Sequence, residues 1–236
     1  FKELGAEVIP YYDTPDGTNI NDFCGSTHPQ KLTQLVAELG ADFGLAFDGD
    51  ADRLIAVDEH GRVVDGDVIM AICALDLKER GLLKKDTLVC TVMSNMGLDI
   101  AMKEHGIQTV KTKVGDRYVL EEMLRSGYCL GGEQSGHIIF LDHNTTGDGI
   151  LTGIQLASIV RRGDKSLSKL ASAVTIFPQV LVGAHVKDEL KNAVMEDAQV
   201  KQRIAALEER FAGHGRVLIR PSGTEPLVRI MIERSE

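Results

Sequence analysis

The stretch Thr87-Leu88-Val89-Cys90-Thr91-Val92-Met93 decides the fold class, because it is apolar on both faces. A strand of that composition is typical of a parallel sheet that helices cover on both sides. Segments with helical periodicity stand on either side of it, at 68–79 and 98–105, and apolar strands follow at 107–112 and 128–130. This alternation predicts βαβ units with right-handed crossovers.

The rest of the chain extends the pattern in both directions. The residue patterns predict further strands at 6–11, 43–47, 54–57, 62–64 and 137–141, and further helices at 29–39, 117–124 and 148–161. A different module begins at Pro178, where strands at 180–186, 216–219 and 228–232 accompany helical segments over 190–211. We expect that module to be α+β with an antiparallel sheet.

Composition narrows the function classes. The 236 residues carry a net charge of -9 and a pI near 5.3, so no basic surface is expected for nucleic acid. No apolar run approaches the roughly 20 residues that cross a bilayer. We therefore expect a cytoplasmic protein. Its four cysteines are scattered without a CxxC pair, which favours free thiols over a disulfide or zinc site.

The segment Phe47-Asp48-Gly49-Asp50-Ala51-Asp52-Arg53 predicts a divalent metal site between two strands. Asp48, Asp50 and Asp52 alternate with the two smallest residues, which lets the chain curl so that three carboxylates converge. Carboxylates that close repel one another, and a hard cation is their natural counter-charge. We expect one Mg²⁺ ion.

A calcium EF-hand is the first alternative for this loop, because it opens with the same spacing of carboxylates. That motif needs glycine at its sixth position and a helix on each side. Here the sixth residue is Arg53, and both flanks have the pattern of strands. A solvated acidic turn is a second alternative.

A phosphate-binding loop is predicted at Arg220-Pro221-Ser222-Gly223-Thr224-Glu225-Pro226, with Arg229 shortly after it. Hydroxyl and amide donors with a bidentate guanidinium are the groups that grip a phosphate monoester. A polar turn between two strands is the alternative, since serine, glycine and threonine are also common in turns.

A third polar loop, Gly131-Gly132-Glu133-Gln134-Ser135-Gly136-His137, lies between two apolar strands. The Glu133 and Ser135 side chains suit vicinal sugar hydroxyls. His137 is a candidate general acid or base, and a structural hydrogen-bonding role is equally compatible with its position. Lys113 follows a predicted strand, where it either meets phosphate or sugar or is simply solvated.

Four motifs in this order resemble the α-D-phosphohexomutase superfamily, and their variants are most similar to the bacterial phosphoglucosamine mutases. They are FDGDADR, KTKVGDRYV, GEQSGH and RPSGTEP. The resemblance covers essentially the whole chain. It implies a partial domain two over 1–64 with the metal loop, a complete domain three over 65–173 with the sugar loop, and a domain four of TATA-binding-protein-like α+β fold over 174–236.

The resemblance also assigns residues. Asp48, Asp50 and Asp52 would hold magnesium, with Arg53 beside the reactive phosphate, and Glu133 and Ser135 would hold sugar hydroxyls. Lys113 and His137 are candidates for proton transfer or for phosphate contacts. The residues implied to bind the non-reacting phosphate are Arg220, Ser222, Gly223, Thr224 and Arg229. The implied reaction moves phosphate from an enzyme serine to glucosamine 6-phosphate and returns the other phosphate of the bisphosphate, giving glucosamine 1-phosphate for the synthesis of UDP-N-acetylglucosamine, the peptidoglycan precursor.

The serine that carries this phosphate is the main departure from the family pattern. The family places it in a Ser-His-Asn-Pro loop, and the nearest string here is Ser26-Thr27-His28-Pro29. The chain also opens on what looks like the last turn of a helix, closed by Gly5. We therefore expect this chain to be a piece of a longer protein and to have no mutase turnover by itself; the full-length protein is a candidate homodimer.

Three other functions remain open at this point. The first is a phosphoglucomutase or phosphomannomutase of the same superfamily, because the hexose phosphates differ at one carbon. The second is a non-catalytic phosphosugar-binding protein. The third is a magnesium-dependent phosphatase that uses an aspartate of the DGDADR loop as nucleophile.

Overall fold

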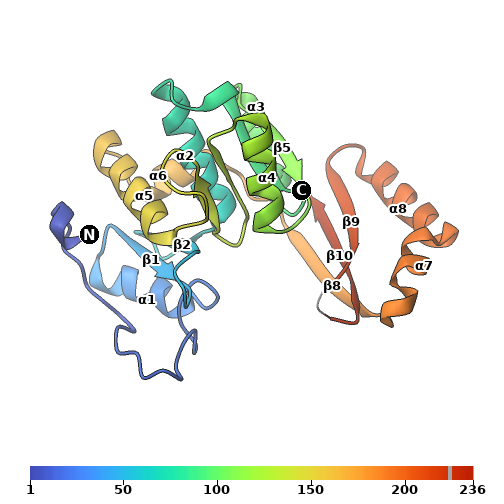
Figure 1. The fold of residues 1–236 in the computed structure, drawn as a ribbon, viewed down its shortest axis with the longest axis horizontal. Coiled ribbons are helices and arrows are strands. Elements are labelled where there is room, and N and C mark those ends of the chain that lie inside the picture. Colours follow the sequence, from blue (N-terminus) through green and yellow to red (C-terminus); the bar gives the residue numbers. More distant parts are fainter. Residues whose placement is uncertain (223–224, 236) are drawn as a thin grey trace. The chain divides into compact units, whose positions relative to one another are not determined.

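The computed structural model describes residues 1–222 and 225–235. The chain forms two compact units: Phe1–Ser94 with Leu98–Thr175, and Asn95–Gly97 with Ile176–Glu236. Figure 1 shows the helices and strands along the chain. Among the described residues, no helix combines the length and the apolar character needed to cross a membrane.

The first sheet of unit 1 is an antiparallel meander in the order β1-β2-β3. Its strands are β1 (Phe43–Phe47), β2 (Leu54–Asp58) and β3 (Val63–Val64). Phe47 stands opposite Leu54, so the acidic loop is the connection of the β1–β2 hairpin. The preceding helix, α1 (Gln30–Leu39), is capped by Gly40, whose φ of 62° lets its amide donate a hydrogen bond to the Val36 carbonyl. The loop is therefore flanked by strands, as predicted, and not by the two helices that an EF-hand requires.

The second sheet has the order β5-β4-β6-β7 and carries the stretch that decided the fold class. Its strands, and the helices that precede, separate and follow them, are in chain order α2 (Gly66–Glu79), η2 (Lys84–Asp86), β4 (Thr87–Thr91), α3 (Met96–Glu104), β5 (Gln108–Thr112), α4 (Asp116–Ser126), β6 (Leu130–Gly132), β7 (Ile138–Phe140), α5 (Gly149–Gly163) and α6 (Leu167–Ala171). β4 is parallel to β5 and β6 as predicted, whereas β7 is antiparallel to β6. The loop 133–137 is too short for a parallel crossover, which needs on the order of a dozen residues.

One hydrophobic core joins the two sheets of unit 1. Leu54 and Ala56 of β2 belong to the same buried cluster as Ile69 of α2, Leu88 of β4 and Leu156 of α5. All five side chains are fully buried. The hairpin that carries the acidic loop is therefore packed rigidly against the second sheet. The three-domain division with boundaries near 64 and 173 stays a prediction.

The prediction of a strand at 6–11 is wrong. Residues 2–4 form a short 3-10 turn, η1 (Lys2–Leu4), closed by Gly5 with φ 87° as the sequence predicts, but 6–11 has no strand structure. In the described part of the chain no strand lies beside it to supply hydrogen bonds, and Pro10 lacks an amide donor. Its apolar pattern alone therefore does not make a strand.

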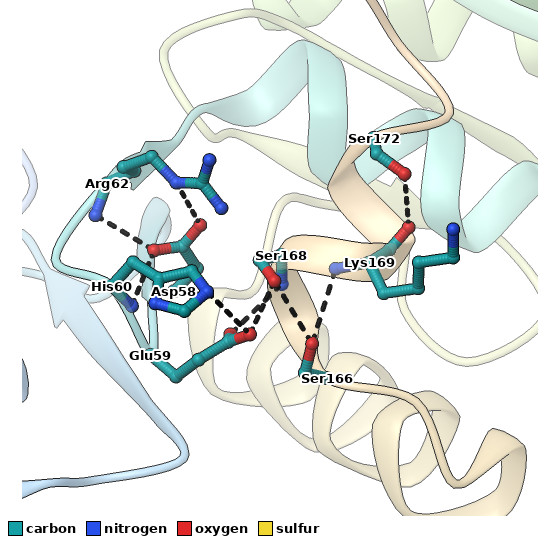
Figure 2. Close-up of polar contacts among 8 residues, drawn as sticks. All are labelled: Asp58, Glu59, His60, Arg62, Ser166, Ser168, Lys169 and Ser172. Atoms are coloured by element: carbon teal, nitrogen blue, oxygen red, sulfur yellow. Dashed lines mark hydrogen bonds and ion pairs between the residues drawn. The ribbon is translucent and has the colours of Figure 1, made fainter.

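The β2–β3 turn is tied to α6 by the carboxylate of Glu59 (Figure 2). Glu59 accepts hydrogen bonds from the Ser168 hydroxyl and, at 3.1 Å, from the Ser168 amide in the first turn of α6. Burial alone would raise the pKa of Glu59, but hydrogen bonds from Ser166 and Ser168 outweigh it and lower the pKa to about 2. The hairpin is thus held at the end opposite to the acidic loop.

Unit 2 is an α+β module, as the sequence predicts. Its elements are β8 (Gln179–His185), η3 (Asp188–Leu190), α7 (Lys191–Glu196), α8 (Ala198–Phe211), β9 (Gly215–Pro221) and β10 (Leu227–Arg234). The strands are antiparallel in the order β8-β10-β9. The predicted helical region 190–211 is broken at Asp197, whose extended backbone and carboxylate cap α8.

Candidate functional site

The three aspartates of the β1–β2 loop converge as the sequence predicts. Asp48, Asp50 and Asp52 each offer an oxygen, and these oxygens all lie within 4.8 Å of one another. Ala51 adopts φ 57°, so the loop turns through a left-handed position between two of the carboxylates. This curl brings residues at alternate positions to one side of the loop.

The carboxylates fit a hard cation electrostatically. Burial is the largest effect that raises the pKa of Asp52, and the close approach of Asp48 raises it further. One oxygen of Asp52, Oδ1, is buried without a hydrogen-bond partner among the described residues. A buried acceptor in a cluster of like charges is the environment that a divalent ion stabilises.

Arg53 is the residue at the C-terminal end of the acidic loop. Its amide donates to Asp48 Oδ1 at 3.1 Å, and its Nε lies 3.7 Å from both Asp48 Oδ2 and Asp52 Oδ1. The Arg53 side chain remains 44% exposed. Its guanidinium can therefore neutralise an anion that approaches the carboxylates from solvent.

The loop 133–137 lies directly beside this hairpin. Arg53 and His137 form an antiparallel bridge, and the Leu54 amide donates to the Gly136 carbonyl at 3.0 Å. Gly136 could not carry a side chain here, because a Cβ would lie 2.2 Å from the Leu54 carbonyl oxygen. The fold thus brings two of the predicted loops into backbone contact.

Hydrogen bonds connect the start of α2 with the loop 133–137. The Gly66 amide donates to the Gln134 carbonyl at 3.0 Å, and Gln134 Nε2 donates to Asp65 Oδ2 at 3.2 Å. The other oxygen of Asp65 caps α2 by accepting from the Val68 amide. Burial raises the pKa of Asp65, although these donors oppose the shift. This support could not be predicted from the sequence, which offers only an acidic residue before a helix as a signal.

His137 is almost completely buried, at 3% exposure. Its Nε2 accepts a 3.2 Å hydrogen bond from the Gly147 amide and lies 3.6 Å from Asp52 Oδ2. The ring of His137 therefore lies between the acidic loop and the loop before α5. This geometry supports a positioning role, and proton transfer by His137 stays a prediction.

The other residues predicted for sugar contacts lie at the same sheet edge. Glu133 Oε1 accepts from the Gly115 amide at 3.0 Å, so the sugar loop touches the loop that follows β5. Ser135 and Lys113 are exposed, and Lys113 Nζ lies 6.0 Å from the centre of the Tyr118 ring. Their side chains are accessible to a ligand, and their roles stay predictions.

The amino end of α5 completes the surroundings of the acidic loop. Asp148 caps this helix by accepting from the Leu151 amide at 2.8 Å. The Gly149 amide donates to the Ala51 carbonyl at 2.8 Å. A Cβ at Gly149 would lie 2.5 Å from the Arg53 carbonyl oxygen, so only glycine allows this approach.

The predicted phosphate loop lies in unit 2, between β9 and β10. Arg220 and Arg229 are directly opposed in the β9–β10 register, and Ser222 is buried at 5% exposure. Arg229 pairs with Glu225 on the same loop. Gly223 and Thr224, also predicted to bind phosphate, lie outside the described residues.

Family models match nearly the whole chain. Three models of phosphoglucomutase/phosphomannomutase match in order: the alpha/beta/alpha domain II at 1–61, the alpha/beta/alpha domain III at 65–177 and the C-terminal domain at 181–236. The chain therefore belongs to the phosphoglucomutase/phosphomannomutase family, as its resemblance to the phosphohexomutases predicted, and its mixed α/β units have that fold.

Curated relatives are phosphoglucosamine mutases. That of Alkaliphilus oremlandii is 66% identical over 232 residues, which are 98% of this chain and 52% of the relative. That of Caldanaerobacter subterraneus is 64% identical over 99% of this chain and 52% of the relative. The chain thus spans about half the length of the curated relatives it matches.

Solved structures show the same fold. A phosphoglucomutase/phosphomannomutase family protein from Burkholderia thailandensis matches all of this chain and 52% of its own, with a TM-score of 0.81 and 25% identity. The N-acetylphosphoglucosamine mutase of Aspergillus fumigatus, solved with GlcNAc-6P and magnesium, matches 92% of this chain and 50% of its own, with a TM-score of 0.73 and 22% identity.

Proposed function

We propose that this chain, as a phosphohexomutase family member, is the metal-binding and sugar-phosphate-binding part of a phosphoglucosamine mutase. The observation that carries the proposal is the backbone bridge between Arg53 and His137, which sets three convergent carboxylates beside the loop of Glu133. A phosphoryl-transfer enzyme needs its metal and the hydroxyls of its sugar close together. The identity of 66% to a phosphoglucosamine mutase supports glucosamine phosphate as the substrate.

Each loop has a role in this proposal. Asp48, Asp50 and Asp52 hold one Mg²⁺ ion, which when bound would neutralise charge on the transferred phosphoryl group. Arg53 meets the same phosphoryl oxygens from the solvent side, where its guanidinium is accessible. Glu133 and Ser135 orient the sugar by its hydroxyls.

The loop of unit 2 binds the phosphate that does not react. Arg220, Ser222 and Arg229 offer the charges and donors that a phosphate monoester requires, together with the predicted contacts of Gly223 and Thr224. Separate sites for the two phosphates suit a reaction in which a bisphosphate must turn round before it returns a phosphoryl group.

The serine that exchanges the phosphoryl group belongs, in this proposal, to the half of the curated relatives that the chain does not span. The serine oxygen–phosphorus bond breaks as the free sugar hydroxyl forms a bond to the same phosphorus; the hydroxyl proton passes to a base, and the departing serine oxygen takes up a proton. After the bisphosphate has turned, the serine hydroxyl gives up its proton and forms a bond to the other phosphorus, while the bond from that phosphorus to the sugar oxygen breaks and the sugar oxygen takes up a proton. We therefore expect no turnover by these 236 residues alone.

The test joins the chain to the amino-terminal half of a curated relative. We expect the joined protein to convert glucosamine 6-phosphate to glucosamine 1-phosphate in the presence of Mg²⁺, and the chain alone to show none of this activity. If the joined protein converted only glucose or mannose phosphates, glucosamine phosphate would be the wrong substrate. Failure of the chain to bind any of the three sugar phosphates, measured by calorimetry, would contradict the proposal.

A further inference from the structure

Lys191, the first residue of α7, is an unusual lysine because it is buried, at 8% exposure. Lysine is almost never buried unless its ammonium is paired. Its surroundings in the sequence, DELKNA, are those of an ordinary charged start of a helix and do not predict burial.

The ammonium of Lys191 has an acceptor for each of its three protons. Nζ lies 2.7 Å from the Ser222 carbonyl oxygen, 2.5 Å from the Glu225 carbonyl oxygen and 2.6 Å from Asp188 Oδ1. An ammonium has three donors, so this set uses them all. Two of the three acceptors belong to the loop that joins β9 to β10.

The loop also has hydrogen bonds of its own. The Ser222 amide donates to the Leu227 carbonyl at 2.8 Å, the Leu227 amide to the Glu225 carbonyl at 2.7 Å, and the Glu225 amide to Ser222 Oγ at 3.3 Å. These bonds connect Ser222, Glu225 and Leu227 with one another. Lys191 binds the carbonyl groups of two of these residues, Ser222 and Glu225.

We infer that Lys191 is a positioning residue for anion binding by this loop, an inference that rests on the phosphate-binding role proposed above. Carbonyl oxygens carry partial negative charge and repel a phosphate. By binding the Ser222 and Glu225 carbonyls, the ammonium neutralises that repulsion and holds the backbone of both residues in place. Its counter-ion Asp188 is 79% exposed, so solvent screens the negative charge of Asp188.

Lys191 therefore acts through the loop and does not touch the phosphate. Its three protons are already used, so it has no donor left for a phosphate oxygen. This distinguishes it from Arg220 and Arg229, for which direct contact is proposed.

The test compares Lys191→Met, Lys191→Arg and the matched control Lys187→Met in the whole chain. Lys187 is exposed and precedes η3 in the same segment, so its replacement makes the same change of charge. Inorganic phosphate and glucosamine 6-phosphate are titrated while the backbone amide signals of Ser222, Glu225 and Leu227 are followed by NMR. We expect Lys191→Met to weaken binding by about tenfold or more, Lys191→Arg by less, and Lys187→Met by less than about twofold.

The outcomes separate the two proposals. Saturable binding to the unaltered chain with unchanged affinity in Lys191→Met would overturn the inference and leave the proposed function standing. If the unaltered chain binds neither probe, the proposed function fails, and with it the anion-binding role of Lys191.

A second measurement does not depend on the folding of any variant. In the unaltered chain, couplings across hydrogen bonds should connect the Lys191 ammonium nitrogen with the carbonyl carbons of Ser222 and Glu225. The ammonium signal should also move when phosphate is added. An ammonium that exchanges rapidly with water and lacks these couplings would overturn the inference.

Discussion

The amide of Gly66 donates a 3.0 Å hydrogen bond to the carbonyl of Gln134, so the first residue of α2 carries the loop that is proposed to hold the sugar. The approach is close because Gly66 has no side chain. A Cβ there would lie 2.2 Å from the Glu133 carbonyl oxygen and 2.7 Å from the Gly136 amide nitrogen. The geometry of this loop therefore depends on a residue almost seventy positions earlier in the chain.

Replacement of Gly66 by alanine should displace this loop. We expect Gly66→Ala to lower the free energy of unfolding by about 1–3 kcal/mol, because a backbone group must shift to admit the methyl group. Chemical denaturation measures the loss. The matched control is Gly163→Ala in α5, where a Cβ would meet nothing within 4 Å and alanine should stabilise the helix by up to about 1 kcal/mol. Equal stability of the two variants would show that α2 does not support the loop.

Magnesium should stabilise the chain through the three aspartates. At an Mg²⁺ concentration of about 100 times Kd, binding adds about 2.7 kcal/mol to the free energy of unfolding. Thermal unfolding with and without Mg²⁺ should show a rise in Tm for the unaltered chain. Asp52→Asn should lose this rise while keeping its Tm without metal, because it removes one of three repelling charges. Asp42→Asn, at an exposed aspartate before β1, should respond as the unaltered chain does. A full Mg²⁺ response in Asp52→Asn would remove Asp52 from the ligand set.

Glu59 should make the stability of unit 1 depend on pH in the acid range. Its folded pKa of about 2 lies below the ordinary value of 4.5, so the folded chain favours the charged form. This contribution is present above the ordinary pKa and is lost as the pH falls toward 2. At pH 7 we expect Glu59→Gln to lower the free energy of unfolding by about 1–3 kcal/mol, the range for hydrogen bonds to a charged group.

Urea denaturation at several pH values measures this effect. The difference between the unaltered chain and Glu59→Gln should shrink between about pH 4.5 and pH 2. Glu38→Gln, at an exposed position of α1, should change stability little at any pH. A Glu59→Gln deficit that stays constant down to pH 2 would mean that the charge of Glu59 does not stabilise the contact shown in Figure 2.

The thiols should differ sharply in reactivity. Burial raises the pKa of Cys73 and, against the opposing charge of Lys111, raises that of Cys90 to about 11. Cys129 is also buried, whereas Cys24 is partly exposed. A thiol reagent at pH 8 should therefore modify one cysteine quickly and the others only after unfolding. Cys24→Ser should abolish the fast phase, and a fast phase that persists in this variant would contradict the burial of the other three.

The sequence by itself determined the local structure and the chemistry. The apolar strand that begins at Thr87 and the helical periodicities depend on neighbours a few residues away, so their pattern is sufficient, although the strand ends at Thr91 and not at Met93. The convergence of Asp48, Asp50 and Asp52 was equally local, since alternate positions in a tight loop lie on one side.

Tertiary structure alone decided which distant groups meet. Residues 6–11 have an apolar pattern, but no strand of the described residues lies beside them, and β7 runs antiparallel because a short loop returns it to β6. Glu59 reaches Ser168 across 109 positions, and Lys191 reaches Ser222 across 31. Such contacts leave no periodic trace, because a hydrogen bond requires only that its two partners lie within about 3 Å in space. The acidic loop was thus predictable as a metal ligand set, whereas the backbone bridge that sets it beside the sugar loop was visible only in the folded chain.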